Sequence, residues 1–274
     1  MLGNSNFKDS FLFTQHSLTT FDNCPLKFRK RYLENLKWDS FPDEKIKRSI
    51  ALGNDFHLLA NRYFMGIDPG LQLSGAECAE LSNWMENLKA YFKLEDQCTY
   101  KPEYKIRMAN GLLKLEANFD LLRIRDGSVE IWDWKTNGGS SGDKRGMKAK
   151  KLQDSLQTKV YMFVLKEQAD LISGEELDCS RISMHYWQPD PPGTLVDISY
   201  DAAMHEEFRD ILESKIENIH GYDYGNFDKS LYNKHCKFCE FNRLCNDERV
   251  DFKAIEENEE FFDELDWDII EEKF

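Results

Sequence analysis

The sequence predicts an α/β protein in which helices flank a mixed β-sheet, and three observations carry this prediction. Three strand-like runs lie between residues 102 and 135, and the dipeptides Asn110-Gly111 and Asp126-Gly127 separate them. Such dipeptides are typical of tight hairpins because both central positions of the turn favour positive φ. Helical periodicity comes before and after these runs, and a further strand follows the second helical region. The order helix, three strands, helix, strand is typical of an α/β sandwich.

The individual elements are expected in the following order. Ser17 is a candidate N-cap of a short helix that reaches Asn23. Pro25 then begins an amphipathic helix that ends at Glu34, because proline is favoured in the first helical turn. Residues 138–151 are rich in Gly, Ser and Lys and predict a mobile basic loop. The remaining elements are helices at 45–65 and 76–94, strands at 102–108, 112–124 and 128–135, a helix at 152–168, strands at 181–188 and 194–199, and a helix at 201–219.

The size and the charge distribution predict one large domain and an acidic tail. The chain has 274 residues, of which 41% are hydrophobic, and this is enough to form a substantial core. We expect the domain at residues 1–246 and the tail at 247–274. The tail holds 13 acidic and 3 basic residues, so it contributes −10 of the net charge of −14 and leaves −4 for residues 1–246. The overall acidity is therefore only a weak argument against a nucleic-acid partner.

Nothing in the sequence indicates a membrane protein. The chain has no uninterrupted apolar run of about 18 residues, the length that a membrane-spanning helix needs. Residues Met1–Ser10 are polar and lack the apolar centre of a secretory signal. We therefore expect no membrane contact and a cytoplasmic location.

Acidic and basic side chains converge on the second and third predicted strands. Because side chains alternate across a strand, Asp120 lies in a polar row on one face of the second strand, and Asp133 and Lys135 project together from the end of the third. Carboxylates are the hard ligands that Mg²⁺ and Mn²⁺ prefer. A neighbouring lysine can stabilise negative charge that develops on a phosphate. Taken alone, however, Asp133 and Lys135 are more typical of a salt bridge at a strand end.

The combination of Asp120, a turn and Asp133-Trp134-Lys135 resembles the hairpin core of the PD-(D/E)XK nuclease superfamily, and more narrowly its RecB-type branch. That branch includes AddB-type nuclease domains of helicase–nuclease complexes and the iron–sulfur CRISPR-associated RecB-like exonucleases. The resemblance extends from about Phe13 to Asn246. Three further motifs carry it, each of which would be an ordinary core or surface pattern on its own: Gly53-Asn-Asp-Phe-His57, Gln157-Thr-Lys-Val-Tyr161, and Cys24-Pro25 followed by Phe28 and Tyr32.

The resemblance implies a restriction-endonuclease-like core with the element order αβββαβ. It also implies a metal-dependent DNA nuclease, with exonuclease action and a preference for single strands or DNA ends. The implied setting is DNA repair, recombination, phage DNA processing or CRISPR adaptation. The alternative is a non-catalytic iron–sulfur subunit that binds DNA or acts as a scaffold in a DNA-processing complex.

The same resemblance implies a divalent ion, Mg²⁺ or Mn²⁺, at the ends of the central strands. Ala117 departs from the family pattern, in which glycine is usual, but alanine is small as well. Glu103 on the first strand either contacts the metal site, as an acidic residue there can in the family, or is a surface carboxylate. The resemblance implies that the metal is bound by His57, Asp120, Asp133 and the Trp134 carbonyl. Lys135 would assist the attacking water. Gln157 and Tyr161 would position the substrate or Lys135.

Three cysteines form a tight group, Cys236, Cys239 and Cys245. In a chain expected in the cytoplasm, such a group indicates metal binding rather than disulfides, and its spacing suits either Zn²⁺ or an iron–sulfur cluster. His235 and Cys24 are both candidates for a fourth ligand. The resemblance implies a 4Fe–4S cluster held by Cys24 and the trio, because in that branch one cysteine precedes the nuclease core and three follow it. Such a cluster would join the N- and C-terminal segments.

Two basic patches are candidate contacts for the DNA backbone, although such residues are also commonly just solvated. The acidic tail interleaves acids with large apolar residues, which is typical of a segment that docks a partner or packs as a short helix. The expected partners are DNA and, through the tail, a helicase, recombination or CRISPR adaptation protein. The basic patches consist of Lys27, Arg29, Lys30 and Arg31, and of Lys144, Arg145, Lys148, Lys150 and Lys151.

Overall fold

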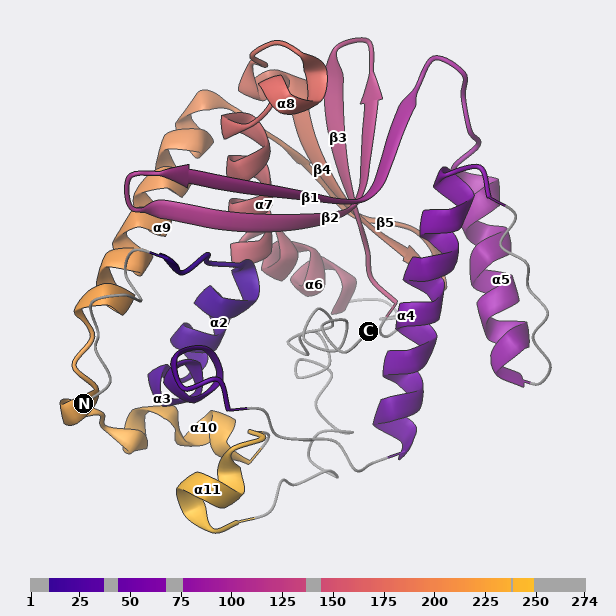
Figure 1. Ribbon diagram of the computed structural model, residues 1–274. Coiled ribbons are helices and arrows are strands. Elements are labelled where there is room, and N and C mark those ends of the chain that lie inside the picture. Colours follow the sequence, from indigo (N-terminus) through magenta and orange to yellow (C-terminus); the bar gives the residue numbers. More distant parts are fainter. Residues whose placement is uncertain (1–9, 37–43, 68–75, 137–143, 238, 249–274) are drawn as a thin grey trace. The chain divides into compact units, whose positions relative to one another are not determined.

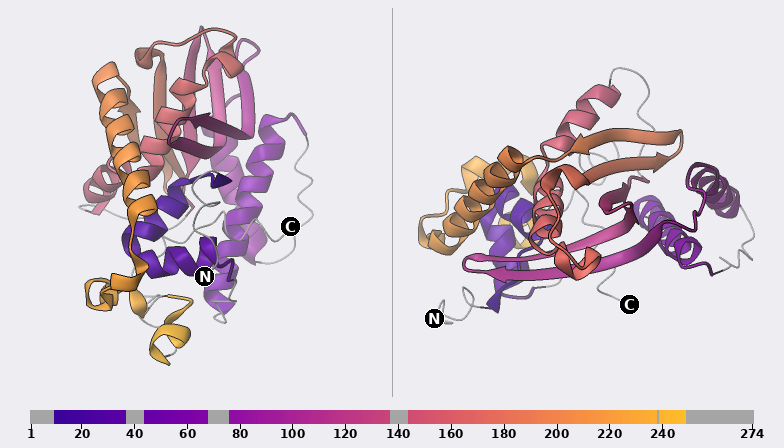
Figure 2. Two further views of the ribbon diagram at one scale, coloured as in Figure 1. Left: turned by 60° about the vertical axis from the view of Figure 1, so that its left-hand side comes forward. Right: turned by 90° about the horizontal axis from the view of Figure 1, so that it is seen from above.

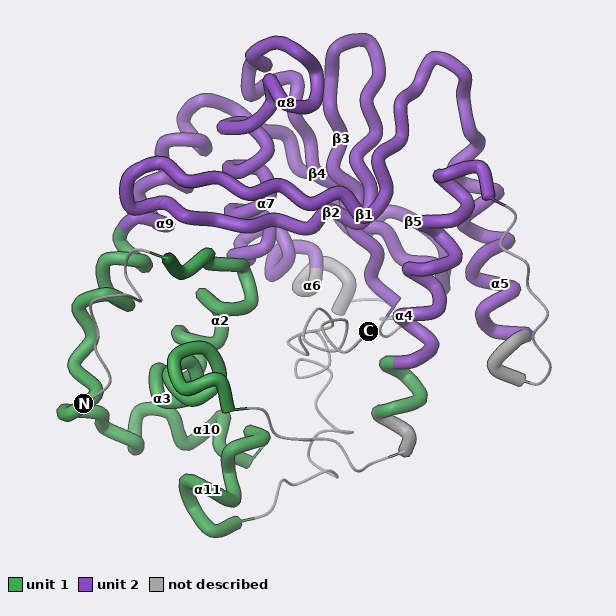
Figure 3. Tube along the Cα trace, in the orientation of Figure 1, with its two compact units in different colours: residues 1–50, 214–274 green, residues 51–213 purple. Residues whose placement is uncertain are grey.

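The computed structural model describes residues 10–36, 44–67, 76–136, 144–237 and 239–248. These residues form two compact units, coloured in Figure 3. The central unit comprises residues 51–213. The terminal unit comprises residues 1–50 and 214–274, so both ends of the chain contribute to it. The acidic tail lies outside the described residues beyond position 248.

A five-stranded mixed sheet forms the middle of the central unit. Its strand order is β1-β2-β3-β4-β5, and every neighbouring pair is antiparallel except β3 and β4, which are parallel. The three-stranded meander and the mixed sheet predicted from the sequence are confirmed, and the element order contains the expected αβββαβ core. The strands are β1 (Thr99–Asn110), β2 (Leu113–Arg125), β3 (Ser128–Trp134), β4 (Ile182–Pro189) and β5 (Pro192–Ser199).

The two turns of the meander differ in structure. Asp126 and Gly127 have φ values of 51° and 71°, as expected for the two central positions of a tight hairpin turn. At the first turn the prediction is wrong for Asn110, because this residue pairs with Leu113 as the last residue of β1. Gly111, with φ 57°, and the residue after it therefore form the turn.

Strand β2 is longer than its contact with β3. Only Leu121–Arg125 of β2 pairs with β3, whereas the residues before Leu121 pair with β1 alone. The β1–β2 hairpin therefore runs on beyond the other strands as a two-stranded ribbon (Figures 1 and 2). We call residues 104–119 the hairpin arm.

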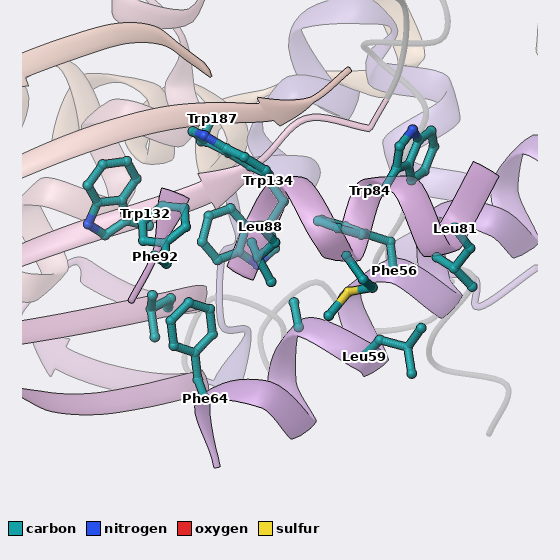
Figure 4. Close-up of a cluster of buried hydrophobic side chains, with 13 residues drawn as sticks. Phe56, Leu59, Phe64, Leu81, Trp84, Leu88, Phe92, Trp132, Trp134 and Trp187 are labelled. Atoms are coloured by element: carbon teal, nitrogen blue, oxygen red, sulfur yellow. The ribbon is translucent and has the colours of Figure 1, made fainter. Parts of the chain in front are cut away.

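Helices of the central unit cover the sheet. Helix α4 (Glu44–Phe64), which begins in the terminal unit, and α5 (Ala76–Tyr91) pack around an aromatic cluster (Figure 4). In this cluster the Phe92 ring lies 4.7 Å from Trp132, 5.3 Å from Trp134 and 5.6 Å from Trp187, measured between ring centroids. Helix α7 (Leu156–Glu167) packs against β1, β2 and β4. The other helices are α6 (Lys144–Gln153), α8 (Asp170–Ser173), the 3₁₀ turn η2 (Cys179–Arg181) and α9 (Ala202–Gly221).

Residues 138–168 were predicted as a loop followed by one long helix, and the structure differs from this prediction. Residues 144–151 belong to helix α6 rather than to a mobile loop, because lysine, methionine and alanine in this stretch all favour helix. The predicted helix at 152–168 is divided, since α7 begins after Ser155, whose Oγ accepts a hydrogen bond from the Thr158 N–H at 3.2 Å. Residues 137–143 and the side chains of residues 144–148 lie outside the described part of the chain.

The terminal unit is built from short helices. Its first helix begins at Gln15 rather than after Ser17, because Thr14 is the N-cap and Ser17 is its capping-box partner. The predicted helix from Pro25 to Glu34 is present, and its second half is π-helical. Within the described residues, no helix combines the length and the apolar character needed to cross a membrane. The elements are α2 (Gln15–Asn23), α3 (Pro25–Phe28), η1 (Arg29–Leu33), η3 (Tyr224–Asn226), η4 (Lys229–Tyr232), α10 (Asn233–Cys236) and α11 (Asn242–Asn246).

Candidate active site

Three acidic residues occupy adjacent positions across β1, β2 and β3. Glu103 lies between two residues that pair with Leu121 and Phe119, so its register position faces Asp120. Continuing the β2–β3 register beyond Leu121 places Asp120 opposite Asp133. We call Glu103, Asp120 and Asp133 the carboxylate row. The row therefore lies at the point where β2 separates from β3.

The backbone at the row is irregular. Glu103 has a φ of 46°, which is uncommon for a residue with a side chain and is typical of strained positions at functional sites. The Trp134 N–H lies where β2 has already left β3, and it donates a hydrogen bond of 2.7 Å to Asp120 Oδ2. A side-chain carboxylate thus replaces the missing strand partner, and it fixes Asp120 next to the Trp134 peptide.

His57 of α4 completes a group of possible metal ligands. Its Nδ1 lies 3.3 Å from Asp120 Oδ1 and 3.7 Å from Glu103 Oε1. Burial lowers the pKa of His57, but the charges and hydrogen bonds of Asp120 and Glu103 outweigh it and raise that pKa well above its usual value. Helix α4 holds this position because the adjacent Phe56 is fully buried in the aromatic cluster.

The donor set of His57, Glu103 and Asp120 fits a divalent cation. One donor atom from each residue lies within 4.8 Å of the other two, so a single ion could contact all three. Two carboxylates and one imidazole suit Mn²⁺, and carboxylates suit Mg²⁺. A proton on the imidazole would balance part of the negative charge of the two carboxylates, and a bound cation would do the same in its place.

Asp133 is turned toward a lysine and an amide. Lys135 Nζ lies 2.6 Å from Asp133 Oδ1, and Gln157 Nε2 donates a hydrogen bond of 2.6 Å to Asp133 Oδ2. Lys135 Nζ also donates to Gln157 Oε1 at 2.9 Å. Gln157 therefore bridges the acid and the base. Metal ligation by Asp133 and by the Trp134 carbonyl stays a prediction.

The electrostatics of this pair follow from its burial. Asp133 is only 3% exposed, and this desolvation raises its pKa to about 6, although the nearby Lys135 ammonium acts in the opposite direction. Burial lowers the pKa of Lys135, but the Asp133 carboxylate outweighs that effect, so the pKa of Lys135 is raised. Lys135 consequently stays positively charged beside the carboxylate row.

Helix α7 brings its two predicted site residues to different places. Gln157 reaches the carboxylate row, as described above. Tyr161, one turn later, is 4% exposed, and its ring packs edge-on against Phe119 at 5.0 Å between centroids. The structure thus brings together His57, Asp120, Asp133, Lys135 and Gln157, while the Tyr161 ring lies against the apolar face of β2.

Tyr186 is a site residue that the sequence did not reveal. It pairs with Asp133 across the parallel β3–β4 ladder, and the Lys135 Nζ lies 5.1 Å from the centre of its ring, within the range of a cation–π contact. Its hydroxyl lies 2.8 Å from Thr158 Oγ1. A tyrosine in an apolar strand gave no signal of this role, because the parallel pairing joins segments far apart in the sequence.

The four cysteines predicted as ligands all belong to the terminal unit. Burial raises the pKa of the Cys24 thiol, and the nearby Cys236 and Cys245 thiols raise it further. Burial likewise raises the pKa of Cys239 to about 12. Cys24 Sγ accepts a hydrogen bond of 3.4 Å from the Lys27 N–H, so backbone donors already support a partial negative charge on one sulfur.

These sulfurs are spread more widely than one metal ion requires. Among the described residues, the only group of three or more possible ligands within 4.8 Å of one another contains no cysteine. A tetrahedral zinc ion with Zn–S bonds of about 2.3 Å would draw its thiolates to within roughly 4 Å of each other. Binding of a metal ion or a cluster by these four cysteines stays a prediction.

Comparison with known proteins identifies a family. The family model of the PD-(D/E)XK nuclease superfamily matches residues 12–109 and 92–246. The crystal structure of SSO0001 is 12% identical, covers 88% of this chain and 89% of its own, and has a TM-score of 0.38. A "Putative exonuclease" from Eubacterium rectale is 11% identical, covers 83% of this chain and 86% of its own, and has a TM-score of 0.48. No curated protein matches the chain.

The family assignment rests on the sequence match, which spans well over half of the chain and contains every residue of the carboxylate row, His57, Lys135 and Gln157. The protein belongs to the PD-(D/E)XK nuclease superfamily.

Proposed function

We propose that the protein is a Mg²⁺- or Mn²⁺-dependent deoxyribonuclease of the RecB-type branch, and that it acts as an exonuclease on single strands or DNA ends. One observation carries this proposal. Three carboxylates, an imidazole and a half-buried ammonium meet where β2 leaves β3. The implied setting is DNA repair, recombination, phage DNA processing or CRISPR adaptation.

His57, Glu103 and Asp120 would hold the cation, with Asp133 and the Trp134 carbonyl as further ligands. Asp133 faces Asp120, and the negative charge of Asp120 contributes to its raised pKa; a cation between the two carboxylates would remove this repulsion. A bound Mg²⁺ or Mn²⁺ would polarise a phosphoryl oxygen and acidify a water molecule.

Lys135 is the group that acts on the substrate phosphate. Its ammonium is kept charged by Asp133, so it can donate hydrogen bonds to an oxygen on which negative charge develops. Gln157 accepts from Lys135 and donates to Asp133, which fixes the direction of the ammonium. The Tyr186 ring and the Tyr161–Phe119 contact hold the two elements from which these groups project.

The decisive experiment measures cleavage of end-labelled linear DNA with Mg²⁺ or Mn²⁺. Asp120→Asn and Asp133→Asn should each lower the cleavage rate at least about 100-fold, as the loss of a charge-stabilising group does in other enzymes. Glu130→Gln is the matched control, because Glu130 lies on the same strand but is paired with Arg123. A wild-type rate in Asp133→Asn would overturn the proposed site.

The same assay tests which nucleic acid is cleaved and whether cleavage needs a free end. Linear single strands, linear duplexes, closed circles and RNA of the same sequence are compared side by side. An exonuclease releases short products from linear DNA and leaves circles intact. DNA binding without cleavage under any of these metal conditions would instead indicate a non-catalytic DNA-binding subunit.

We also propose that Cys24, Cys236, Cys239 and Cys245 hold a 4Fe–4S cluster that joins the two segments of the terminal unit. An anaerobically purified chain should be brown, with a broad visible absorption band that Cys239→Ser removes. Cys98→Ser is the control, because Cys98 lies outside this group and in the central unit. Metal analysis that finds zinc and no iron would replace the cluster by a zinc site.

A further inference from the structure

The hairpin arm has one apolar and one polar face. Strand β1 alternates here between buried and exposed positions and β2 between buried and half-buried ones, and helix α7 packs against both strands. The buried face consists of Ile106, Met108, Leu113, Leu115, Ala117 and Phe119. The opposite face consists of three cross-strand pairs, Lys105 with Asn118, Arg107 with Glu116, and Ala109 with Lys114.

The polar face begins at the carboxylate row. On β2, positions two apart share a face, so Asn118, Glu116 and Lys114 follow Asp120 on the same side. Successive positions on one face of an antiparallel strand are about 7 Å apart. Three such steps carry the polar face roughly 20 Å away from the proposed metal ligands.

This face is positively charged in an acidic protein. It carries Lys105, Arg107 and Lys114 against one carboxylate, Glu116, so its net charge is +2 by formal count, while the whole chain carries −14. The side chains of Lys105 and Arg107 are 49% and 64% exposed. Neither cation is buried by the fold, and both are available to a ligand.

Glu116 arranges the two exposed cations. Its carboxylate is only 17% exposed, lies 3.5 Å from Lys105 Nζ through Oε1, and accepts a hydrogen bond from Arg107 Nε through Oε2. Both cations therefore converge on the middle of the arm. The spacing along the strand is comparable to that of successive phosphates in an extended nucleic-acid strand, and a row of cations at this spacing suits a polyanionic backbone.

We propose that the polar face of the hairpin arm binds the sugar–phosphate backbone of the DNA strand that passes through the carboxylate row. Lys105, Arg107 and Lys114 contact successive phosphates, and Asn118 is the polar side chain nearest to the row. These contacts are made to the backbone, so they hold the strand without selecting its sequence. That the ligand is DNA rests on the proposed function. The charge of this face and its position beside the carboxylate row are independent of that proposal.

Binding of a dye-labelled single-stranded oligonucleotide to the full chain tests the proposal. Fluorescence anisotropy is measured at several salt concentrations without added divalent cation, so cleavage plays no part. In the triple variant Lys105→Gln, Arg107→Gln, Lys114→Gln, the slope of log affinity against log salt should fall by about 2, since each lost phosphate contact contributes about 0.7.

Arg125→Gln is the matched control. It removes one positive charge, as each of the three substitutions does, but from the other end of β2, where Arg125 is 45% exposed and paired with Glu95, and it should keep the wild-type slope. Glu116→Gln is the second variant. It removes the only acid from the face and should bind several-fold more tightly, a gain that a misfolded protein cannot produce.

The outcomes separate this proposal from the proposed nuclease activity. A triple variant with the wild-type salt slope, or a wild-type chain that does not bind at low salt, overturns the role of the arm even where the chain cleaves DNA. A chain that binds through the arm but cleaves nothing leaves the arm in place and refutes the nuclease.

Discussion

At the scale of single residues, Asp133 shows how a weak sequence signal becomes a site. The salt bridge that an isolated Asp-x-Lys motif predicts is present, with 2.6 Å between Lys135 Nζ and Asp133 Oδ1. The pair is nevertheless not solitary, because Gln157 contacts both partners and Asp120 faces the acid. These two neighbours distinguish the pair from an isolated strand-end ion pair, and they are consistent with the proposed metal and phosphate site.

Gln157 is therefore expected to matter for both folding and rate. In Gln157→Leu, the buried Asp133 carboxylate loses the donor to Oδ2 and the half-buried Lys135 loses an acceptor, which should lower the free energy of unfolding by about 1–3 kcal/mol. The cleavage rate should fall while the substrate KM changes little, because Gln157 acts through Lys135. Urea unfolding and steady-state kinetics measure the two effects. Gln157→Glu is the comparison, since it keeps an acceptor for Lys135 but no donor for Asp133.

At the scale of elements, local patterns predicted what local chemistry controls. The alternation along β2 and the Asp126-Gly127 turn placed the meander to within a few residues. Helix α6 was missed because neighbouring glycine and serine residues masked its helix-forming side chains. The neighbourhood of Tyr186 and Asp133 was not predictable, because a parallel pairing joins strands that a whole helical region separates.

The packing of α9 on α7 includes a histidine that should make stability depend on pH. His205 lies 3.0 Å from Glu167 Oε1 and 2.8 Å from the Tyr200 hydroxyl, and its ring stacks on Phe163. Burial lowers the pKa of His205 in spite of the opposing Glu167 carboxylate. The folded protein thus binds a proton less readily than the unfolded chain, whose histidine has a pKa of about 6.5.

Stability should consequently be full above about pH 6.5 and should decline as the pH falls from there toward the lower pKa of the folded state. The His205→Gln variant does not titrate, so its urea midpoint should change less between pH 7.5 and pH 5.5, values chosen to lie about one unit on either side of the unfolded pKa. Equal changes in the variant and the wild type would show that folding does not shift the pKa of His205, and would contradict the prediction.

At the scale of the whole molecule, the two ends of the chain meet in the terminal unit. Buried Glu240 contacts Lys27 at 3.1 Å and forms a salt bridge with Arg31, so an acid from the C-terminal segment joins cations of the N-terminal segment. The family resemblance implied that these segments meet. The ion pairs were not predictable, because a lysine- and arginine-rich helix alone does not indicate its partner.

Removing this buried acid should destabilise the terminal unit. In Glu240→Ala the loss should be about 2 kcal/mol, less than the roughly 3–5 kcal/mol of a fully buried pair, because Lys27 and Arg31 remain 23% and 20% exposed. Lys215→Gln is the control, since it breaks an exposed pair with Asp22 that also joins the two segments and should cost well under about 1 kcal/mol. Urea unfolding of each chain gives both numbers.

The two turns of the meander are expected to differ in how well they tolerate an inserted residue. One residue added at Asp126-Gly127 would slip β3 against β2 and turn Asp133 away from Asp120, since a shift of one position reverses every side chain of a strand. An insertion after Gly111 that enlarges the loop and keeps the β1–β2 pairing would not disturb β3, because β3 pairs only with Leu121–Arg125 of β2. A peptide tag at the tip of the arm is therefore expected to disturb the Asp120–Asp133 pairing less than one at Asp126-Gly127.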